Sequence, residues 1–405
     1  MCSIKLIVYS LIVICTVQSQ YGNGIVQESR DAQRIKKGSL FIGKNSFDKG
    51  NLLFAVCEKN TTSATNCNVV QKVYPNSQST YSCFITIKGD YDESRLNFRI
   101  GVATLGKDKA ILYWGEEYND SLIAKVGTVD LKTCKMNHIS IPDPSKEVLL
   151  NLMYTDKIVA YSDDSFDLFY NDSKQCHDKL CRIQIHANGT VKGDPIVSDI
   201  PGGMVHYVSP IASRSSSKGY VYLKKDPMEY NLSIVKADGT TNQLSTYVNT
   251  ARPTVSVSND IISACTKPSV DSDVICTQYD EDGQVKFMTT IPEIYKNSQP
   301  RALTHLPDGG ILVLLAEFSN CDYLQNCDEG KYHMVKIDKN GKYIGNAPIR
   351  DFDNVNNQWK YTFVYKFDES KYCACIIGQD PVIDNLRLSN FEIIHNCVTE
   401  KDFSA

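Results

Sequence analysis

Three arginines in different parts of the sequence each precede a short polar turn, at nearly the same distance from it. Arg252 and Arg301 each precede their turn by seven residues, and Arg99 precedes its turn by eight. A guanidinium group binds a carboxylate or sulfate through paired charged hydrogen bonds. Arginines that recur at one level of a repeat would therefore form an anion site, although arginines with a structural role at strand starts are the alternative. With a histidine and a tryptophan from two further segments, the candidate ligand-binding residues are Arg99, His206, Arg252, Arg301 and Trp359.

The sequence lacks the motifs of the common enzyme classes. It contains no G-x-S-x-G, no P-loop, no G-x-G-x-x-G and no H-E-x-x-H. It also has no C-x-x-C pair, its acidic runs fall at turns, and its seven histidines are scattered. We therefore predict no metal ion and no cofactor, and we favour a binding protein over an enzyme.

The elements that position these candidates recur seven times. Each repeat has an apolar or alternating run, a tight polar turn and a second apolar run, and the turns follow one another at 42 to 62 residues. A period near 50 with about four strands per unit predicts an all-β, seven-bladed β-propeller, with six blades as the alternative. In the third repeat we place the first strand at 148–155 and the second at 157–162. The second runs are 52–57, 110–114, 158–161, 220–223, 261–265, 311–316 and 372–377.

An Asn-Gly or Asp-Gly pair joins the third and fourth strands of four repeats. The pairs are 188–189, 238–239, 282–283 and 340–341. Both residues of such a pair tolerate positive φ angles, so we predict two-residue hairpins at these places.

The seventh repeat offers only three strands before the sequence ends. A ring with a three-stranded blade would expose a strand edge, which favours aggregation. We predict that the segment 24–29 (GIVQES) supplies the missing outer strand and closes the ring. The alternative is a lead peptide that takes no part in the ring.

The first residues predict the compartment. Lys5, the apolar stretch 6–17 and the small residues that follow it match a signal peptide over 1–19, and an uncleaved anchor is the alternative. Residues 20–405 then form a single propeller domain, with core repeats at 37–397. A formal charge of −4 without any basic tract argues against nucleic acid as a partner, and no later stretch is long enough to span a membrane. The predicted glycosylation sites are Asn60, Asn119, Asn171, Asn188 and Asn231.

The cysteines fit an extracellular protein stabilised by disulfides. Of the 15, Cys2 and Cys15 leave with the signal peptide, and in an oxidising compartment the rest are expected to pair. Cys397 can pair with Cys373 or Cys375, and we expect Cys375. Cys83 and Cys134 can form a bridge between blades. The other expected pairs are Cys57–Cys67, Cys176–Cys181, Cys265–Cys276 and Cys321–Cys327.

We expect a secreted glycoprotein that acts as a binding or interaction module. Its propeller face or channel mouth would bind an extracellular protein or a small anionic ligand. The alternative is an extracellular hydrolase or lyase with its site at the channel mouth. A monomer is expected, although the odd number of cysteines leaves a thiol that allows a disulfide-linked dimer.

Overall fold

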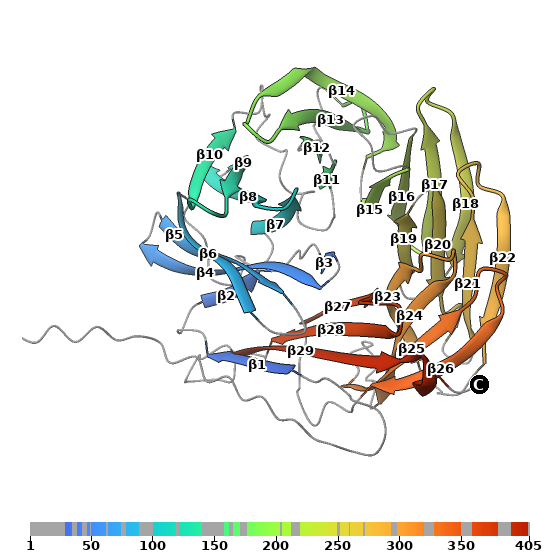
Figure 1. Ribbon diagram of the computed structural model, residues 1–405. Helices are drawn as coiled ribbons and strands as arrows, with labels where there is room; N and C mark the ends of the chain where they lie inside the picture. Colours follow the sequence, from blue (N-terminus) through green and yellow to red (C-terminus); the bar gives the residue numbers. More distant parts are fainter. Residues whose placement is uncertain are drawn as a thin grey trace, which may run out of the picture.

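Seven antiparallel sheets stand around a ring, and each sheet is one blade of a propeller (Figure 1). This confirms the predicted seven-bladed β-propeller. First strands of neighbouring blades contact one another, so they are the strands that line the axis. The computed structural model describes residues 29–34, 39–42, 47–48, 50–61, 64–73, 78–88, 100–118, 121–139, 158–161, 165–170, 176–202, 205–211, 219–248, 252–258, 260–269, 272–292, 298–319, 328–349, 359–379 and 390–403.

The blades are numbered in chain order. Blade 1 consists of β2 (Ser39–Ile42), β4 (Asn51–Thr61), β5 (Ala64–Val73) and β6 (Gln78–Lys88), with the short β3 (Phe47–Asp48) paired to β4. Blade 2 consists of β7 (Ile100–Leu105), β8 (Lys109–Tyr118), β9 (Ser121–Asp130) and β10 (Lys135–Ile139). Blade 3 consists of β11 (Ile158–Ala160), β12 (Ser165–Tyr170), β13 (Lys179–His186) and β14 (Val191–Pro201). Blade 4 consists of β15 (Val205–Pro210), β16 (Gly219–Asp226), β17 (Glu229–Lys236) and β18 (Thr241–Val248).

The last three blades follow the same plan. Blade 5 consists of β19 (Thr254–Ser258), β20 (Ile261–Thr266), β21 (Val274–Tyr279) and β22 (Val285–Ile291). Blade 6 consists of β23 (Ser298–His305), β24 (Ile311–Ser319), β25 (Asp328–Ile337) and β26 (Tyr343–Ile349). Blade 7 consists of β27 (Trp359–Lys366), β28 (Lys371–Gln379), β29 (Asn390–Thr399) and the N-terminal strand β1 (Ser29–Arg34). A short 3-10 helix, η3 (Glu400–Asp402), follows β29.

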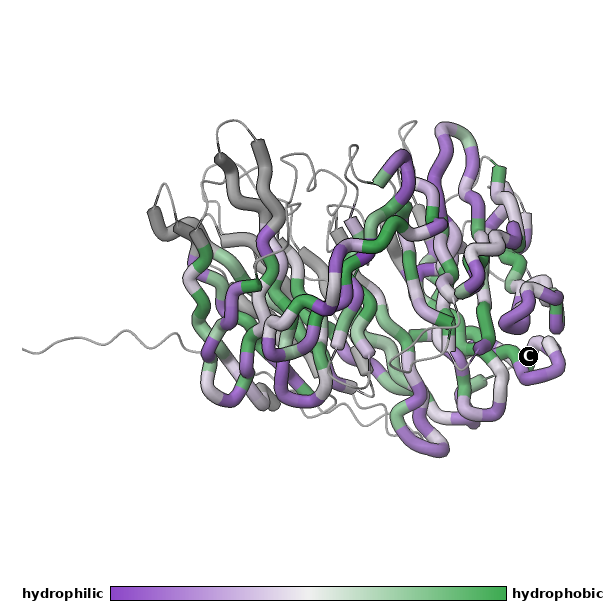
Figure 2. The backbone as a smooth tube through the Cα atoms, turned by 90° about the horizontal axis from the view of Figure 1, so that it is seen from above, coloured by the Kyte–Doolittle hydropathy of each residue, from purple (hydrophilic) through white to green (hydrophobic). Residues whose placement is uncertain are grey.

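The core lies between the blades. Second strands are apolar on both faces because each face packs against a different neighbouring blade. In blade 6, all six side chains from Ile311 to Ala316 are buried. Figure 2 shows this pattern, with hydrophobic segments along the strands and hydrophilic residues at the turns. Burying one such aliphatic side chain stabilises the fold by about 1.5–3 kcal/mol.

A strand near the N-terminus closes the ring, as the sequence predicts, but its residues differ from the predicted ones. β1 pairs antiparallel with β29 from Ser29↔His395 to Arg34↔Asn390, whereas the prediction placed the closing strand at 24–29. An outermost strand needs few apolar residues, because one of its edges has no neighbour and much of it meets solvent. The outer strand β14, largely exposed or half-buried, shows the same tolerance.

Blade 3 corrects the predicted position of its strands. Residues 158–160, predicted as part of the second strand, form the first strand β11, and the second strand is β12 at 165–170. The predicted first strand at 148–155 lies outside the described residues. In the sequence, Asp167 makes 163–167 look like an acidic turn. In the structure every side chain of β12 is buried, Asp167 included.

The four Gly-containing hairpins are longer than predicted. Only the glycine of each pair has a positive φ, for example 84° at Gly239, and Asp238 is not among the positive-φ residues. The Gly239 N–H donates to the Lys236 carbonyl, and Lys236 N–H donates to the Thr240 carbonyl. These are three-residue loops in which a type I turn ends in a glycine bulge. The Asp238 carboxylate accepts the Thr240 N–H at 2.9 Å, which fixes the turn without a positive φ at the aspartate.

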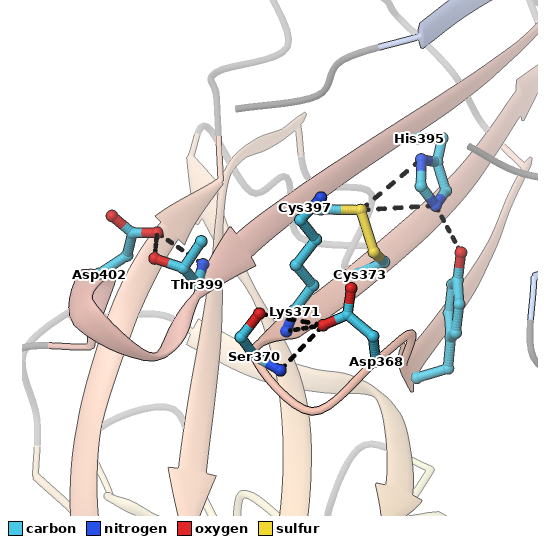
Figure 3. Close-up of a disulfide and its surroundings, with 9 residues drawn as sticks. Asp368, Ser370, Lys371, Cys373, His395, Cys397, Thr399 and Asp402 are labelled. Atoms are coloured by element: carbon cyan, nitrogen blue, oxygen red, sulfur yellow. Dashed lines mark hydrogen bonds between the residues drawn. A yellow bond between two sulfur atoms is a disulfide. The ribbon is translucent and has the colours of Figure 1, made fainter. Parts of the chain in front are cut away.

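Five disulfides link the described cysteines, and three of the expected pairs are among them. Cys83–Cys134 joins β6 of blade 1 to the turn before β10 of blade 2, so it is the inter-blade bridge that the sequence allows. In blade 7, Cys397 pairs with Cys373 and not with Cys375 (Figure 3), because the strand register sets Cys373 directly opposite it. Cys321 and Cys327 lie outside the described residues. The confirmed local pairs are Cys57–Cys67, Cys176–Cys181 and Cys265–Cys276.

Cys375 is the free thiol among the described cysteines, and it is fully buried. It packs against Leu52, Phe54 and Val70 of blade 1. A thiol in this position cannot reach a second molecule while the propeller is folded, so Cys375 cannot form the disulfide-linked dimer that the odd cysteine count allows. Within the described ranges, no helix has the length and apolar character needed to cross a membrane.

Candidate functional site

The predicted ligand-binding residues that the structure describes belong to one end of the ring. The first strands all run the same way along the axis, so residues at or just before their starts lie at one end, which we call the strand-start face. Arg252 lies two residues before β19, His206 is the second residue of β15, and Arg301 is the fourth residue of β23. Trp359 opens β27, but its side chain is not described, and Arg99 lies outside the described residues.

Arg252 and His206 are brought into direct contact across two blades. The Arg252 Nη2 donates to the His206 backbone carbonyl at 2.9 Å, and the Arg252 side chain is exposed. The His206 ring meets the Tyr230 ring edge-on, with centroids 5.7 Å apart. Lys225 Nζ stands 5.7 Å from the centroid of the same Tyr230 ring, a cation–π contact. Two cations and two aromatic rings therefore gather at the start of blade 4.

Two exposed apolar side chains lie at the same end of blade 4 as this group. Met228, in the hairpin between β16 and β17, is 68% exposed, and Val248 at the end of β18 is 54% exposed. The register pairs Val248 with Glu229, which directly follows Met228, so both lie at the same end of blade 4. Apolar surface at the same end as an exposed cation is a composition that suits ligand binding. We call Arg252, His206, Tyr230, Met228 and Val248 the blade 4 patch.

Arg301 stands two blades from β15 and is exposed. Its backbone carbonyl accepts a hydrogen bond from Thr362 Oγ1 of blade 7 at 2.9 Å. The preceding carbonyl, that of Pro300, accepts one from Thr254 Oγ1 of blade 5 at 3.0 Å. These side-chain-to-backbone bonds tie consecutive first strands together and fix the level of the exposed Arg301 along the axis.

A second group of polar side chains, centred on Asp167, was not predicted from the sequence. Between blades 3 and 4, the buried Asp167 Oδ2 accepts hydrogen bonds from the hydroxyls of Tyr161 and Tyr220, each at 2.6 Å. Arg182 Nη1 lies 3.2 Å from the same oxygen and donates to the Tyr220 hydroxyl at 2.6 Å. Burial, together with the negative charge of Asp167, raises the pKa of Tyr161 well above its usual value. This group joins two blades, and its carboxylate meets no solvent because Asp167 is 0% exposed.

A third polar group joins blades 5 and 6. His305, the last residue of β23, lies with Nε2 2.9 Å from Ser263 Oγ and with Nδ1 3.4 Å from Ser256 Oγ. Burial lowers the pKa of His305 to about 4, so its imidazole is neutral at physiological pH. Serine beside histidine is a pairing used for nucleophilic catalysis. Ser263 is fully buried, however, and a substrate cannot reach its hydroxyl.

Comparisons with known proteins give no family. No model of a protein family matches the chain, and no curated protein sequence matches it. Solved structures are similar in shape at low identity. A prolyl endopeptidase has a TM-score of 0.48 and 9% identity over 89% of this chain and 50% of its own, so the chain spans half the length of that protein. The β-propeller domain of the Trilobed protease from Pyrococcus furiosus has a TM-score of 0.46 and 11% identity, covering 84% of this chain and 89% of its own.

A polysaccharide lyase, Uly1, is similar to the same degree. Its TM-score is 0.45 at 9% identity, with 86% of this chain and 89% of that chain covered. Likenesses of this size concern the fold alone. The propeller assignment rests on the seven sheets themselves.

Proposed function

We propose that the chain is a secreted glycoprotein that acts as a binding module, and that its strand-start face binds a ligand carrying an anionic group beside an apolar one. The blade 4 patch is the observation that carries this proposal. Arg252 offers an exposed guanidinium, Tyr230 an aromatic ring, and Met228 and Val248 an exposed apolar surface. Arg301 adds a second exposed guanidinium on the same face.

Secretion is supported by the disulfides. Five bridges among the described cysteines are typical of proteins from oxidising compartments. The predicted signal peptide at 1–19 lies outside the described residues. We propose that cleavage there releases a propeller of residues 20–405.

Two of the five predicted glycosylation sites have described side chains. Asn188 is exposed in the turn between β13 and β14 and suits a glycan. Asn231 is half-buried in β17, and its Nδ2 donates to Asp226 Oδ2 and to Glu229 Oε1, each at 2.9 Å. Asn60 lies in β4 without a described side chain, and Asn119 and Asn171 lie outside the described residues. We propose Asn188 as the first site to examine by mass spectrometry.

The enzymatic alternative lacks a specific observation in its favour. A hydrolase or lyase needs an acid, a base or a nucleophile that meets substrate. The shorter of the two described serine–histidine contacts, Ser263 with His305, is closed to solvent at the serine. Binding therefore remains the function that the geometry supports best.

The binding proposal is tested with 8-anilinonaphthalene-1-sulfonate, a fluorescent aromatic sulfonate that combines both ligand features. We expect saturable binding to the folded protein and an affinity about 10–100-fold lower in the double variant Arg252→Ala/Arg301→Ala. This range corresponds to the net loss of one charged hydrogen bond to the sulfonate, which costs about 1.5–3 kcal/mol. Fluorescence titration at fixed salt gives the dissociation constants.

The matched control is Lys192→Ala. It removes an exposed cation near the start of β14, at the end of the ring opposite the strand-start face. It should leave the affinity unchanged. Equal affinities for the wild type and the double arginine variant, with unchanged melting temperatures, would refute the proposal.

A further inference from the structure

Blade 7 holds a two-by-two array of sulfur and imidazole side chains. β28 contains Cys373-Ala374-Cys375 and β29 contains His395-Asn396-Cys397. The register sets Cys373 opposite Cys397 and Cys375 opposite His395. Residues two apart in a strand point to the same face, so all four side chains share one face of the blade. That face packs against blade 1.

Three side chains of the array hold their ligand atoms close together around the Cys373–Cys397 disulfide, whose sulfur atoms are 2.00 Å apart. The ligand atoms of Cys373, His395 and Cys397 all lie within 4.8 Å of one another. Cys397 Sγ is 3.9 Å from His395 Nδ1 and 3.8 Å from Nε2, and Figure 3 shows the imidazole beside the sulfur. Around a tetrahedral zinc ion, a sulfur ligand and a nitrogen ligand are about 3.5 Å from each other. All four residues of the array are buried, as in structural zinc sites.

A neighbouring tyrosine orients the histidine. Tyr365 of β27 lies opposite Cys373 in the register, and its hydroxyl is 2.6 Å from His395 Nε2. Metal-bound histidines use their second ring nitrogen in a hydrogen bond of this kind, which fixes the tautomer and the ring orientation. With Nε2 bonded to Tyr365, the reduced site would bind an ion through Nδ1, the nitrogen 3.9 Å from Cys397 Sγ.

We propose that this array in its thiol form is a zinc site, with Cys373, Cys397 and His395 as ligands and Cys375 in the fourth position. The Cys373–Cys397 disulfide is then the oxidised form of the site. A phosphine reductant opens it by giving two electrons to the S–S bond. The phosphine takes the oxygen of a water molecule, and the two protons of that water go to the two sulfurs. Zn²⁺ then displaces the protons of three thiols, which are released, while neutral His395 donates the Nδ1 lone pair.

Two other disulfides show why blade 7 differs. Cys57–Cys67 and Cys265–Cys276 also join directly opposed residues of second and third strands. Two residues along the strands from Cys57–Cys67, the register pairs Ala55 with Val69. Two residues along from Cys265–Cys276, it pairs Ser263 with Gln278. These side chains offer no thiolate or imidazole, so the reduced pairs would provide only two good zinc ligands each.

The test uses the full chain, refolded in a phosphine reductant and titrated with Co²⁺ as a spectroscopic probe for zinc. We expect one Co²⁺ per chain, displaced by Zn²⁺, with the intense visible bands of a tetrahedral site and sulfur-to-cobalt charge transfer. Cys375→Ser should lower the charge-transfer intensity by about a third, because three thiolates become two. Tyr365→Phe should weaken binding about tenfold, and His395→Ala should weaken it more.

The double variant Cys57→Ser/Cys67→Ser is the control for metal held by unfolded thiols. It should bind Co²⁺ like the wild type if the site is in blade 7. The proposal is overturned if the reduced chain binds no Co²⁺, if His395→Ala binds it with wild-type affinity, or if the control variant loses it to the same extent as Cys373→Ser/Cys397→Ser. None of these results bears on the anion site at the strand-start face.

Discussion

At the scale of single residues, polar groups in this propeller act as ties between blades. Asp167 puts a carboxylate into an otherwise apolar second strand, and its charge is balanced from both sides of the interface. Tyr220 comes from blade 4, and Tyr161 and Arg182 come from blade 3. A buried charge with these partners is tolerated, whereas a buried charge left alone is strongly unfavourable.

Replacing Asp167 by alanine should therefore destabilise the fold strongly. The change leaves the half-buried Arg182 without its carboxylate and opens a space between the blades, so we expect a loss of about 3–5 kcal/mol in the free energy of unfolding. Asp199→Ala is the matched control, because Asp199 pairs with Lys179 at the surface and such pairs contribute about 1 kcal/mol or less. Urea unfolding measures both variants, and equal losses would contradict the assigned role of Asp167.

His305 predicts an acid-labile contact between blades 5 and 6. Its pKa is about 4 in the folded protein and about 6.5 when unfolded, so the unfolded chain takes up a proton more readily. The contribution of neutral His305 is complete above pH 6.5 and is lost as the pH falls from 6.5 to 4. We expect His305 to account for a loss of about 2–3 kcal/mol between pH 7.5 and pH 4.5. His305→Gln should show a smaller loss over this range, and identical pH profiles of stability would rule the contact out as the cause.

At the scale of strands, how well an element can be predicted from the sequence depends on its place in the blade. The apolar second strands and the Asp-Gly turns are readable from the sequence because burial on both faces and glycine bulges leave clear patterns. The outer strand β1 and the second strand β12 are not. β1 is polar because an outer strand needs little apolar surface, and β12 looks like a turn because Asp167 finds its partners only in the folded structure.

The candidate site shows the same division. The repeat predicts that Arg252 and Arg301 lie at one level, because their distance from the turns is the same, and it predicts that His206 lies on or just before a first strand. The exposed Met228 and Val248 next to Tyr230 depend on a hairpin and a register that the sequence does not specify. The same holds for the array in blade 7. A C-x-C and an H-x-C separated by some twenty residues have no recognisable metal spacing until two strands set them side by side.

Ring closure gives a prediction for one strand. Deleting residues 20–34 removes β1 and leaves β29 with an open edge, so we expect the melting temperature to fall by at least about 5 °C and aggregation to increase. Deleting residues 20–28 is the control, because it keeps every residue of β1, and it should leave the melting temperature near the wild-type value. Calorimetry compares the three proteins. A similar melting temperature for both deletions would show that β1 does not hold the ring.

At the scale of the whole molecule, two kinds of disulfide stabilise the ring differently. Cys57–Cys67 links strands within blade 1 and closes a sequence separation of 10, whereas Cys83–Cys134 links two blades across 51 residues. By chain entropy, the longer loop contributes about 4 kcal/mol and the shorter about 3 kcal/mol. We expect Cys83→Ser/Cys134→Ser to lose about 1 kcal/mol more than Cys57→Ser/Cys67→Ser in urea unfolding. The reverse order would show that the inter-blade bridge adds little.

The pairing of β1 with β29 also sets the order of events during synthesis. β1 leaves the ribosome among the first residues of the propeller, and its partner is the last strand of the ring. At about 5–20 residues per second, roughly 20–70 s pass before the two strands can meet. Throughout that time β1 must stay without its partner β29. Blades 1 to 6 must form before blade 7 is complete and the ring is closed. A chain that stops before β29 therefore cannot close its ring, so closure reports that translation has reached the final strand.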